Sequence, residues 1–562
     1  MPDSDQSQGR GYQSILSAVD FSPLSSAALL ATRVSADCYE DAPNTKEPVM
    51  VSNDQSEVIE FLASPATYGA GTVERIDTHT SVVFLAGSGA YKLKRAVLFD
   101  YVDFSSLERR HYCCEAEVRL NRRTAPTLYK GVVPVVRSDS GQLSLGGEGR
   151  VIDWLVEMQR FDQDQLLDRL AADRRLDVDV MVALATSIAD LHRVAASRSD
   201  HGGAQGMEWV VDGNAASFAG FRADELDTDA SANLIVHTRR ELERHGALLE
   251  RRRQTGRVRE CHGDLHLRNV VLLNGRPTLF DGVEFNDDIS CIDVLYDLAF
   301  LLMDLWRRRL TLHANVIVNR YVAESGELEG LCLLPFFLSC RAAVRAKTSV
   351  SAARVQTDDA RRRELYESAS EYLRMAGELL RPARPLLVAI GGFSGSGKSS
   401  VAKEIAPAFG APPGALVFRS DEIRKELCGV PSLERLGPEG YTAHVSRRVY
   451  ETLAQRARRA ILNGRAVVAD AVFADQAQRR AIEAVARDLG VAFVGCWLSA
   501  PEEVLISRAE QRRSDASDAD PAIVRRQHVQ GTGPIEWTVV DAVGTKEGVV
   551  QAVSDLLSRG AR

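Results

Sequence analysis

Residues 392–399 read Gly-Phe-Ser-Gly-Ser-Gly-Lys-Ser and directly follow the apolar run 386–390, Leu-Leu-Val-Ala-Ile. They fit the pattern G-x-x-x-x-G-K-[ST] in its usual setting, in which a strand ends, a glycine-rich loop turns and a helix begins near Lys398. The backbone N–H groups of such a loop and the positive end of the helix face one point, where they bind phosphate groups. The stretch therefore predicts an α/β unit with a nucleotide site.

Two side chains of this loop have chemical roles of their own. Lys398 is expected to reach the β- and γ-phosphates and to act in catalysis, and Ser399 is expected to ligate the Mg²⁺ that accompanies ATP. The residues expected to hold the nucleotide are Gly392, Ser394, Gly395, Ser396, Gly397, Lys398, Ser399 and Ser400.

The length and composition are those of a multidomain soluble protein. A chain of 562 residues with 45% hydrophobic and 26% charged residues predicts two or three domains with full cores. Residues 1–13 are polar and lack the features of a signal peptide, no apolar run is long enough to span a bilayer, and the nine cysteines form no C-x-x-C motif. These features favour a cytoplasmic protein that neither enters a membrane nor depends on disulfides or zinc.

The charge pattern argues against a polynucleotide partner. The net charge is −8, and from Arg384 onward 24 Lys and Arg residues stand against 21 Asp and Glu residues. A domain so close to neutral has no evident basic groove, so no nucleic acid is expected as a partner.

Residues 1–50 form a separate extension. Residues 14–30 are typical of a strand, a turn and a capped helix, and they resemble the opening strand and helix of universal stress proteins. Because this resemblance covers only about 25 residues, a mobile tail is the simpler interpretation.

A compact unit begins near Val51. The pattern predicts a helix at 56–62, a strand at 72–76 and a hairpin of strands 81–86 and 90–94, followed by a helix at 107–123. Lys92 lies on the second hairpin strand, and the helix carries Glu115 and Glu117. A strand lysine followed by a helix glutamate is the pair with which protein kinases hold the α- and β-phosphates, although many sheets beside helices offer such a pair.

The segment His-Gly-Asp-Leu-His-Leu-Arg-Asn at 262–269 adds a stronger signal. Asp264 and Asn269 lie five residues apart, and Asp281 follows a predicted hairpin. This order supplies an acceptor-activating carboxylate and two oxygen ligands for Mg²⁺.

Together these motifs over about 51–375 resemble the aminoglycoside phosphotransferase and choline kinase-like branch of the protein-kinase fold. The resemblance implies that Asp264 is the catalytic base, that Asn269 and Asp281 bind metal, and that Lys92 and Glu117 bind ATP, with Glu115 an alternative to Glu117. Asp293 and Asp297 match the segment after the metal-binding aspartate; we expect them to cap a helix or to form internal hydrogen bonds.

The departures from this family concern the phosphate loop and the acceptor. Residues 77–80, Asp-Thr-His-Thr, stand where protein kinases have a glycine-rich loop, and Asp-Gly-Val-Glu-Phe at 281–285 replaces Asp-Phe-Gly. A small hydroxylated acceptor is therefore expected in place of a protein. The basic residues Arg341, Arg345 and Lys347 could face a phosphate or water, and water is the simpler expectation.

Residues 381–385 form a proline-containing linker to the α/β unit. Strands are predicted at 386–391, 415–420, 466–471 and 491–498, alternating with helices as in a parallel sheet. Asp421 and Asp470 follow two of these strands, so they should lie at the edge that carries the phosphate loop. Asp421 is expected to act as a base and Asp470 to hold Mg²⁺, although either could instead cap a helix.

The polar stretch at 514–520 could close as a lid over ATP. Arg508, Arg512 and Arg513 precede a polar, acidic segment, and Arg512 is the candidate to stabilise the transferring phosphoryl group. A solvated arginine face is an equally good interpretation of the same residues.

Ser-Asp-Glu-Ile-Arg-Lys at 420–425 makes this half resemble small P-loop kinases of the gluconate kinase, chloramphenicol phosphotransferase, polynucleotide kinase and zeta-toxin type. The whole arrangement resembles two-domain bacterial phosphotransferase and ATP-binding fusion proteins. The predicted domains are an extension at 1–50, a bilobal kinase-like domain at 51–380 and a P-loop domain at 381–562.

The leading hypothesis is an ATP- and Mg²⁺-dependent phosphotransferase with two nucleotide sites, each acting on a small-molecule hydroxyl. Its chief rival is a stress or regulatory ATPase in which one or both sites only bind or slowly hydrolyse ATP. A 5′-polynucleotide kinase is a third interpretation, which the near-neutral charge of the second half does not favour. The oligomeric state and the acceptor do not follow from the sequence.

Overall fold

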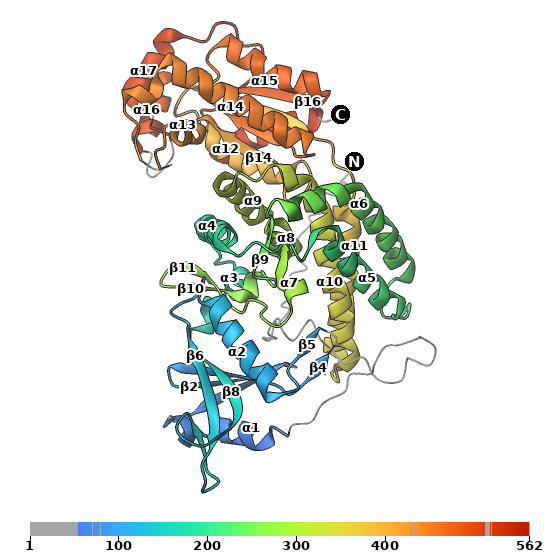
Figure 1. Cartoon of the computed structure of the whole chain (residues 1–562). Helices are drawn as coiled ribbons and strands as arrows, with labels where there is room; N and C mark the ends of the chain where they lie inside the picture. Colours follow the sequence, from blue (N-terminus) through green and yellow to red (C-terminus); the bar gives the residue numbers. More distant parts are fainter. Residues whose placement is uncertain are drawn as a thin grey trace, which may run out of the picture.

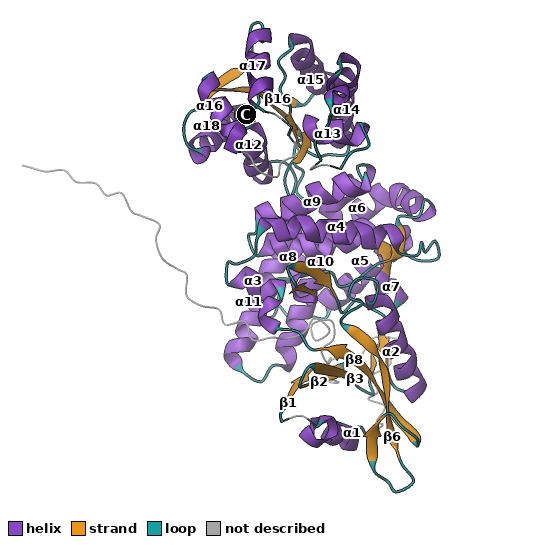
Figure 2. Ribbon diagram, turned by 90° about the vertical axis from the view of Figure 1, so that its left-hand side faces the viewer, coloured by secondary structure: helices purple, strands orange, loops and turns teal. Residues whose placement is uncertain are grey.

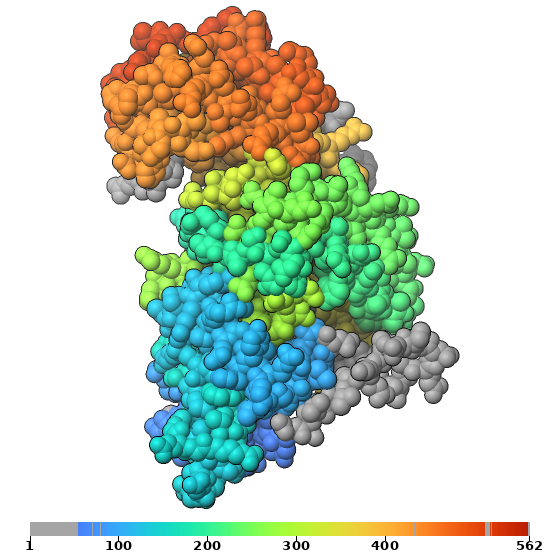
Figure 3. Space-filling model, viewed as in Figure 1, coloured from blue at the N-terminus to red at the C-terminus, as the bar shows by residue number. Residues whose placement is uncertain are grey.

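A computed structural model describes residues 54–69, 71–78, 80–99, 101–431, 434–511, 517–518 and 520–560. The stress-protein-like segment within 1–50 lies outside these ranges. The chain runs along the molecule from the blue N-terminal part through the green and yellow middle to the orange C-terminal part (Figure 3).

The N-terminal lobe is an antiparallel sheet with the strand order β1-β2-β3-β8-β6-β7. Helix α2 (Leu107–Asn121) packs on β8 and β6, and α1 (Ser56–Ala63) packs on β1 (Figure 1). The strands are β1 (Val73–Asp77), β2 (Ser81–Ala86), β3 (Gly89–Lys94), β6 (Tyr129–Arg137), β7 (Leu143–Leu145) and β8 (Arg150–Gln159), beside a small pair of β4 (Leu98–Phe99) and β5 (Val102–Asp103).

The predicted hairpin is present as β2 and β3, in which Val83 pairs with Lys92 and Ser81 with Lys94. Side chains alternate across a strand, so both lysines lie on one face of the sheet, next to α2. The long strands β6 and β8 carry mixed apolar and polar residues and were not predicted.

The middle of the molecule is helical and forms the largest core. Its central helix is α8, in which twelve of fourteen residues are buried. The helices are α3 (Leu167–Ala172), α4 (Val178–Val194), α5 (Gly203–Ala219), α6 (Thr228–Gln254), α7 (Asp287–Ser290), α8 (Val294–Arg307), α9 (Thr311–Ser325), α10 (Leu334–Val355) and α11 (Asp359–Leu379).

Two short strand pairs frame the 262–269 segment within this helical region. Strand β9 (Val258–Glu260) precedes the segment and pairs with β12 (Cys291–Asp293), while β10 (Val270–Leu273) follows it and forms a hairpin with β11 (Arg276–Leu279). The segment is thus fixed at both ends, as Figure 1 shows beside α8.

The P-loop unit is a five-stranded parallel sheet with the order β14-β15-β13-β16-β17. All six residues of its central strand are buried, as expected for a parallel strand covered on both faces. Val388 and Ile390 pack with α12 and α18, whereas Leu387 and Ala389 face the cluster that includes α14 and α15. The P-loop follows the carboxyl end of this strand, where such sheets bind ligands.

Strands and helices alternate along this unit. The strands are β13 (Leu386–Gly391), β14 (Leu416–Arg419), β15 (Val467–Asp470), β16 (Ala492–Ser499) and β17 (Thr538–Asp541). The helices are α12 (Lys398–Ile405), α13 (Ser420–Leu427), α14 (Ala443–Leu462), α15 (Gln476–Leu489), α16 (Glu502–Gln511), α17 (Pro521–Gln530) and α18 (Lys546–Gly560).

The predicted fold class, a bilobal kinase-like domain followed by a parallel-sheet P-loop domain, is confirmed. The fifth strand, β17, was missed because it is four residues long and mostly exposed. Figure 2 shows the two sheets at opposite ends with helices between them. Within the described residues, no helix is both long and apolar enough to cross a membrane.

Arg110 and Asp153 form a buried ion pair that joins α2 to β8, with Nε–Oδ1 at 2.8 Å and both side chains 1% exposed. Arg110→Met should lower the free energy of unfolding of the N-terminal lobe by about 3–5 kcal/mol, because it leaves the Asp153 charge buried without its partner. Amide exchange of β3 and β8 measures this. The double variant Arg110→Met/Asp153→Leu should recover most of the loss, and equal damage in the single and double variants would contradict the explanation.

Candidate active sites

Lys92 bridges two acidic residues at the junction of the N-terminal lobe and the helical region. Its Nζ lies 2.9 Å from Glu117 Oε1 and 2.7 Å from Asp281 Oδ1. Glu115, the alternative partner, is 63% exposed and faces His111 instead. The structure therefore pairs Lys92 with Glu117 and brings the metal-ligand candidate Asp281 to the same lysine.

A second ion pair lies directly behind the first. Lys94 Nζ is 2.6 Å from Glu117 Oε2 and also contacts Glu284, and the three side chains are at most 4% exposed. Glu284 was not singled out from the sequence. The available signal was its place in the segment 281–285, three residues after Asp281.

The electrostatics keep these groups charged although they are buried. Burial raises the pKa of Glu117, but Lys92 and Lys94 outweigh it and hold this pKa at about 2. Burial would lower the pKa of Lys94, yet Glu117 and Glu284 raise it. Glu284 differs, because burial and the nearby Glu117 raise its pKa in spite of Lys94.

The backbone at Asp281 is held in an uncommon conformation. Its φ is +60°, its N–H donates to the Tyr129 hydroxyl at 3.0 Å, and the next N–H, of Gly282, donates to Asn121 Oδ1 at 2.8 Å. A non-glycine residue at positive φ needs such support from its surroundings. Side chains of β6 and α2 therefore fix Asp281 where it meets Lys92.

Asp264 and Asn269 lie together in the 262–269 segment. Asn269 Nδ2 donates to Asp264 Oδ2 and to the Asp264 carbonyl, both at 3.0 Å, and His266 Nε2 is 3.5 Å from Asp264 Oδ1. Although burial raises the pKa of Asp264, His266, His262 and Arg345 hold it well below its ordinary value. Asp264 is therefore an ionised, buried carboxylate.

Two carboxylates of α8 hold the backbone of this segment. Asp297 accepts the N–H groups of His262 at 3.2 Å and Gly263 at 2.8 Å, and Asp304 accepts the N–H of Leu267 at 3.2 Å. Asp293 caps the same helix through the N–H of Leu295 at 2.9 Å. The expectation that Asp293 and Asp297 cap a helix or form internal hydrogen bonds is confirmed, with Asp293 as the cap.

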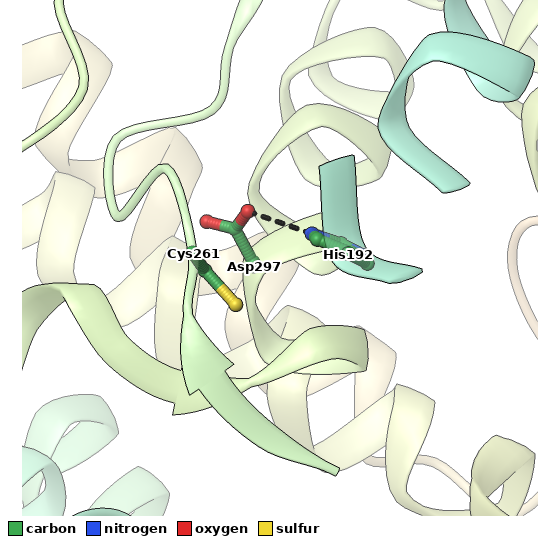
Figure 4. Close-up of side chains that lie close together, drawn as sticks. All are labelled: His192, Cys261 and Asp297. Carbon is green, nitrogen blue, oxygen red and sulfur yellow. Dashed lines mark hydrogen bonds and ion pairs between the residues drawn. The ribbon is translucent and has the colours of Figure 1, made fainter. Parts of the chain in front are cut away.

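His192, Cys261 and Asp297 form a compact buried cluster (Figure 4). His192 Nε2 lies 3.0 Å from Asp297 Oδ2, and its Nδ1 lies 2.9 Å from the Tyr321 hydroxyl, while the Cys261 thiol donates to the Ile292 carbonyl at 3.5 Å. Burial raises the pKa of Cys261 well above its usual range. These hydrogen bonds give the cluster a structural role as the support of the 262–263 backbone.

The oxygen donors of Asn269 and Asp281 fit a magnesium ion. The side-chain nitrogen of Asn269 donates to Asp264, so its side-chain oxygen is the atom that could bind a metal ion. Lys92 contacts Oδ1 of Asp281, so Oδ2 is the second candidate metal ligand. Magnesium prefers such oxygen ligands.

A cavity of about 360 Å³ lies among α5, α6, α7 and β12. Trp209 and Tyr296 supply aromatic walls, and Asp200, Glu250 and Asp288 supply carboxylates. It borders β12, the strand paired with β9 just before the 262–269 segment.

The basic residues of α10 do not all face water. Arg341 is 5% exposed, and its guanidinium lies over the ring of Tyr296 at 3.8 Å. Arg341 is therefore a packing residue, and the expectation of a solvated side chain is wrong for it. Lys347 is half-buried, and burial lowers its pKa to about 8.

The P-loop has the geometry of a phosphate site. Gly395 adopts φ +87°, and a Cβ there would collide with the Leu505 carbonyl, so the close approach of α16 requires glycine. Ser396 Oγ is buried without a hydrogen-bond partner among the described residues. Lys398 Nζ donates to the Phe393 carbonyl at 3.1 Å across the loop.

Ser399 and Asp470 meet at the sheet edge, as expected for two groups that share one magnesium ion. Ser399 Oγ lies 2.5 Å from Asp470 Oδ2, and Asp470 pairs in register with Ile390 at the end of β13. Arg419 lies 3.4 Å from the same carboxylate oxygen and donates to Ser399 at 3.1 Å. Arg419, which sequence reasoning missed, comes from the neighbouring strand β14.

Asp421 lies in the first turn of α13, next to these residues. Burial raises its pKa, Arg419 opposes the shift and Asp470 adds to it, so the pKa stays above the ordinary value. Neither Asp421 nor Asp470 is the N-cap of a helix, because α13 begins after Arg419 and α15 begins after Asp475.

Within the described residues, α17, which follows the expected lid, contacts the P-loop, and Asp518 of the expected lid contacts α13. Arg512 and Arg513 lie outside the described residues, and Arg508 donates to the carbonyls of Ala542 and Val543. Gln527 of α17 instead bonds Ser394 in the loop, accepting its N–H at 2.9 Å. Asp518 pairs with Lys425 of α13 at 3.0 Å.

The comparisons with known families agree with this geometry. Residues 102–331 match the phosphotransferase enzyme family, and residues 387–532 match the AAA domain family. The chain joins a phosphotransferase-family domain to a P-loop domain. Lys92 lies before residue 102, where the match to the phosphotransferase enzyme family begins. In the structure it nevertheless contacts Glu117 and Asp281, which lie within the matched residues.

Curated relatives match this chain over most of its length. The uncharacterized proteins Rv2004c of Mycobacterium tuberculosis and Mb2027c of Mycobacterium bovis are each 29% identical over 489 residues, which cover 84% of this chain and 92% of each relative.

Two solved structures match portions of the chain. A gluconokinase from Sinorhizobium meliloti is 21% identical, covers 32% of this chain and 96% of its own, and has a TM-score of 0.24. A choline/ethanolamine kinase family protein from Mesorhizobium loti is 12% identical, covers 58% of this chain and 95% of its own, and has a TM-score of 0.35.

Glu117 offers a test of the buried charge network. Its folded-state pKa of about 2 lies below the ordinary 4.5, so its stabilising effect is complete above about pH 4.5 and is lost as the pH falls toward 2. Glu117→Gln should therefore destabilise the N-terminal lobe by about 3 kcal/mol at pH 7 and by much less near pH 3.

Denaturant unfolding of the full chain at both pH values measures this difference. The exposed Glu115→Gln on the same helix is the matched control, and it should change stability by less than about 0.5 kcal/mol at either pH. A Glu117→Gln effect that does not shrink in acid would contradict the charge network as its cause.

Proposed function

We propose that this protein is an ATP- and Mg²⁺-dependent phosphotransferase with two nucleotide sites, each acting on a small-molecule hydroxyl. The observation that carries the proposal is that each domain has its own complete set of groups. Each set contains a cation, a buried carboxylate and oxygen donors, to which we assign phosphate binding, proton uptake and magnesium binding.

At the N-terminal site, Lys92 is the contact for the α- and β-phosphates, and Glu117 holds its ammonium in place. Asp264 accepts the hydrogen bond of the acceptor hydroxyl and receives its proton as the new P–O bond forms and the bond to ADP breaks. Its lowered pKa keeps it ionised and ready to orient the hydroxyl over a broad pH range.

At the C-terminal site, the loop N–H groups and Lys398 hold the phosphates, and Asp421 receives the acceptor proton. The raised pKa of Asp421 makes it a stronger base than an ordinary aspartate once it is ionised. Arg419 lies beside Ser399 and Asp470, where positive charge stabilises a transferring phosphoryl group.

Magnesium, when bound, neutralises phosphate charge and aligns the transferring group. Asn269 and Asp281 would hold it in the first domain, and Ser399 and Asp470 in the second. Gln527 of α17 closes against the P-loop and would exclude water there.

For the N-terminal acceptor, the cavity of Trp209 and Tyr296 is the proposed binding place. A size of about 360 Å³ suits a small molecule, and its mixed aromatic and carboxylate lining suits a polyol or amino alcohol. The acceptor at the C-terminal site is likewise proposed to be a small molecule.

Two single variants separate the sites. Asp264→Asn should keep ATP binding at the N-terminal site and lower transfer there by at least about 100-fold, because the amide cannot take up the proton. Lys398→Ala should remove only the C-terminal activity. ATP-consumption assays of the full chain with sugars, amino sugars, nucleosides and aminoglycosides measure both.

If the wild-type chain hydrolyses ATP at a rate that no acceptor changes, the transferase proposal is contradicted and the regulatory ATPase is favoured. Loss of both activities in Lys398→Ala would show that the sites depend on each other.

The two bases predict different pH profiles. In the Asp264→Asn chain only Asp421 acts, and its raised pKa means that kcat falls as the pH drops through a higher value than for an ordinary aspartate. In the Lys398→Ala chain only Asp264 acts, and its lowered pKa carries activity to lower pH. Each pH unit below the relevant pKa should cost about tenfold in kcat, and acid limbs that coincide would contradict these assignments.

A further inference from the structure

Helix α9 of the phosphotransferase domain lies along the edge of the P-loop sheet. Strand β14 is the last strand on this side and pairs with β15 alone among the strands that the structure describes. Asn319 of α9 accepts the N–H of Val417 through Oδ1 at 2.7 Å and donates through Nδ2 to the Ala415 carbonyl at 3.2 Å. One side-chain amide thus meets the two main-chain groups that another strand would meet.

The chain leading into β14 is held in the same way. Asn315, one helical turn earlier, donates to the carbonyls of Pro413 and Ala415, both at 3.0 Å. Gly414 has φ +106°, and a Cβ there would lie 2.5 Å from the Ala406 carbonyl oxygen and 2.8 Å from Asn315 Nδ2, so glycine is required by this φ and by the close approach of both groups. From the other side, the buried Arg465 donates to the carbonyls of Ala411 at 2.8 Å and Gly414 at 2.7 Å.

The contact between α9 and the β14 segment lies a few residues from groups of both candidate sites. Val417 is two residues before Arg419 and four before Asp421. On α9, Tyr321 follows Asn319 by two residues and contacts His192, which contacts Asp297, the acceptor of the His262 and Gly263 N–H groups. Figure 1 shows α9 directly beneath β14 and α12.

We propose that Asn319 is a positioning residue for the C-terminal site: by completing the edge of β14, it sets where Asp421 and Arg419 stand relative to the P-loop. The inference rests on the proposed function, and it adds that the P-loop site requires a side chain of the other domain. The P-loop itself follows β13, the central strand, so nucleotide binding does not depend on this amide.

The test uses the full chain with Asp264→Asn, so that only C-terminal transfer is measured. Asn319→Leu keeps the side-chain size and removes the hydrogen bonds to Val417 and Ala415. The Val417 amide should then exchange at least about tenfold faster, because its N–H loses its acceptor. In the same variant kcat should fall about tenfold, while KM for ATP changes less than about twofold.

Arg459→Ala is the matched control. Arg459 lies 3.4 Å from Glu329 in a second contact between the domains, with both side chains more than half exposed, and this pair does not touch β14. Its removal should leave Val417 exchange and kcat unchanged. If Asn319→Leu does not fold, Asn319→Ser is too short to reach Val417 and should give the same split.

An unchanged Val417 exchange rate, an unchanged kcat, or equal losses in kcat and in ATP affinity would each overturn the positioning role. If the wild-type chain shows no acceptor-dependent phosphate transfer, the proposed function itself is contradicted. In that case the exchange of Val417, compared between wild type and Asn319→Leu, still reports whether Asn319 holds the edge strand.

Discussion

Asp297 carries a negative charge inside the protein, with no exposure to solvent, and the N-terminal site is built around its hydrogen bonds. A buried carboxylate is stable only if donors surround it, and here two donors are backbone N–H groups of the 262–263 segment. His192 and Tyr321 extend the network to α4 and α9. The need to satisfy one charge therefore holds the backbone that carries Asp264 in a single conformation.

In the C-terminal site, the groups that surround negative charge are mainly backbone N–H groups and not side chains. The glycines of the P-loop let main-chain N–H groups converge on one point, and the five-stranded sheet presents Asp470 and Asp421 at the same edge. Lys398, Ser399 and the two carboxylates therefore lie close to the point on which these N–H groups converge. A cation beside this edge, Arg419, comes from the strand that α9 supports.

The two domains therefore share more than a linker. Leu416 and Phe418 of β14 belong to the same buried apolar cluster as Ile317 and Val318 of α9. The two asparagines add directional bonds to this contact, and such bonds fix register where apolar packing alone would allow sliding. A helix that supports the first catalytic segment on one side thus supports the edge of the second sheet on the other.

The sequence by itself determined the local elements of both sites. The spacing of Asp264 and Asn269, the hairpin with Lys92 and the P-loop after a buried strand follow from periodicity and turn chemistry, which act over a few residues. Only the tertiary structure decided which groups meet across long separations. It chose Glu117 over Glu115, brought Glu284 to Lys94, buried Arg341 against Tyr296, and set Asn319 on β14. Those choices depend on helix phase and on the need to pair every buried charge and amide, and that requirement exists only once the chain has folded.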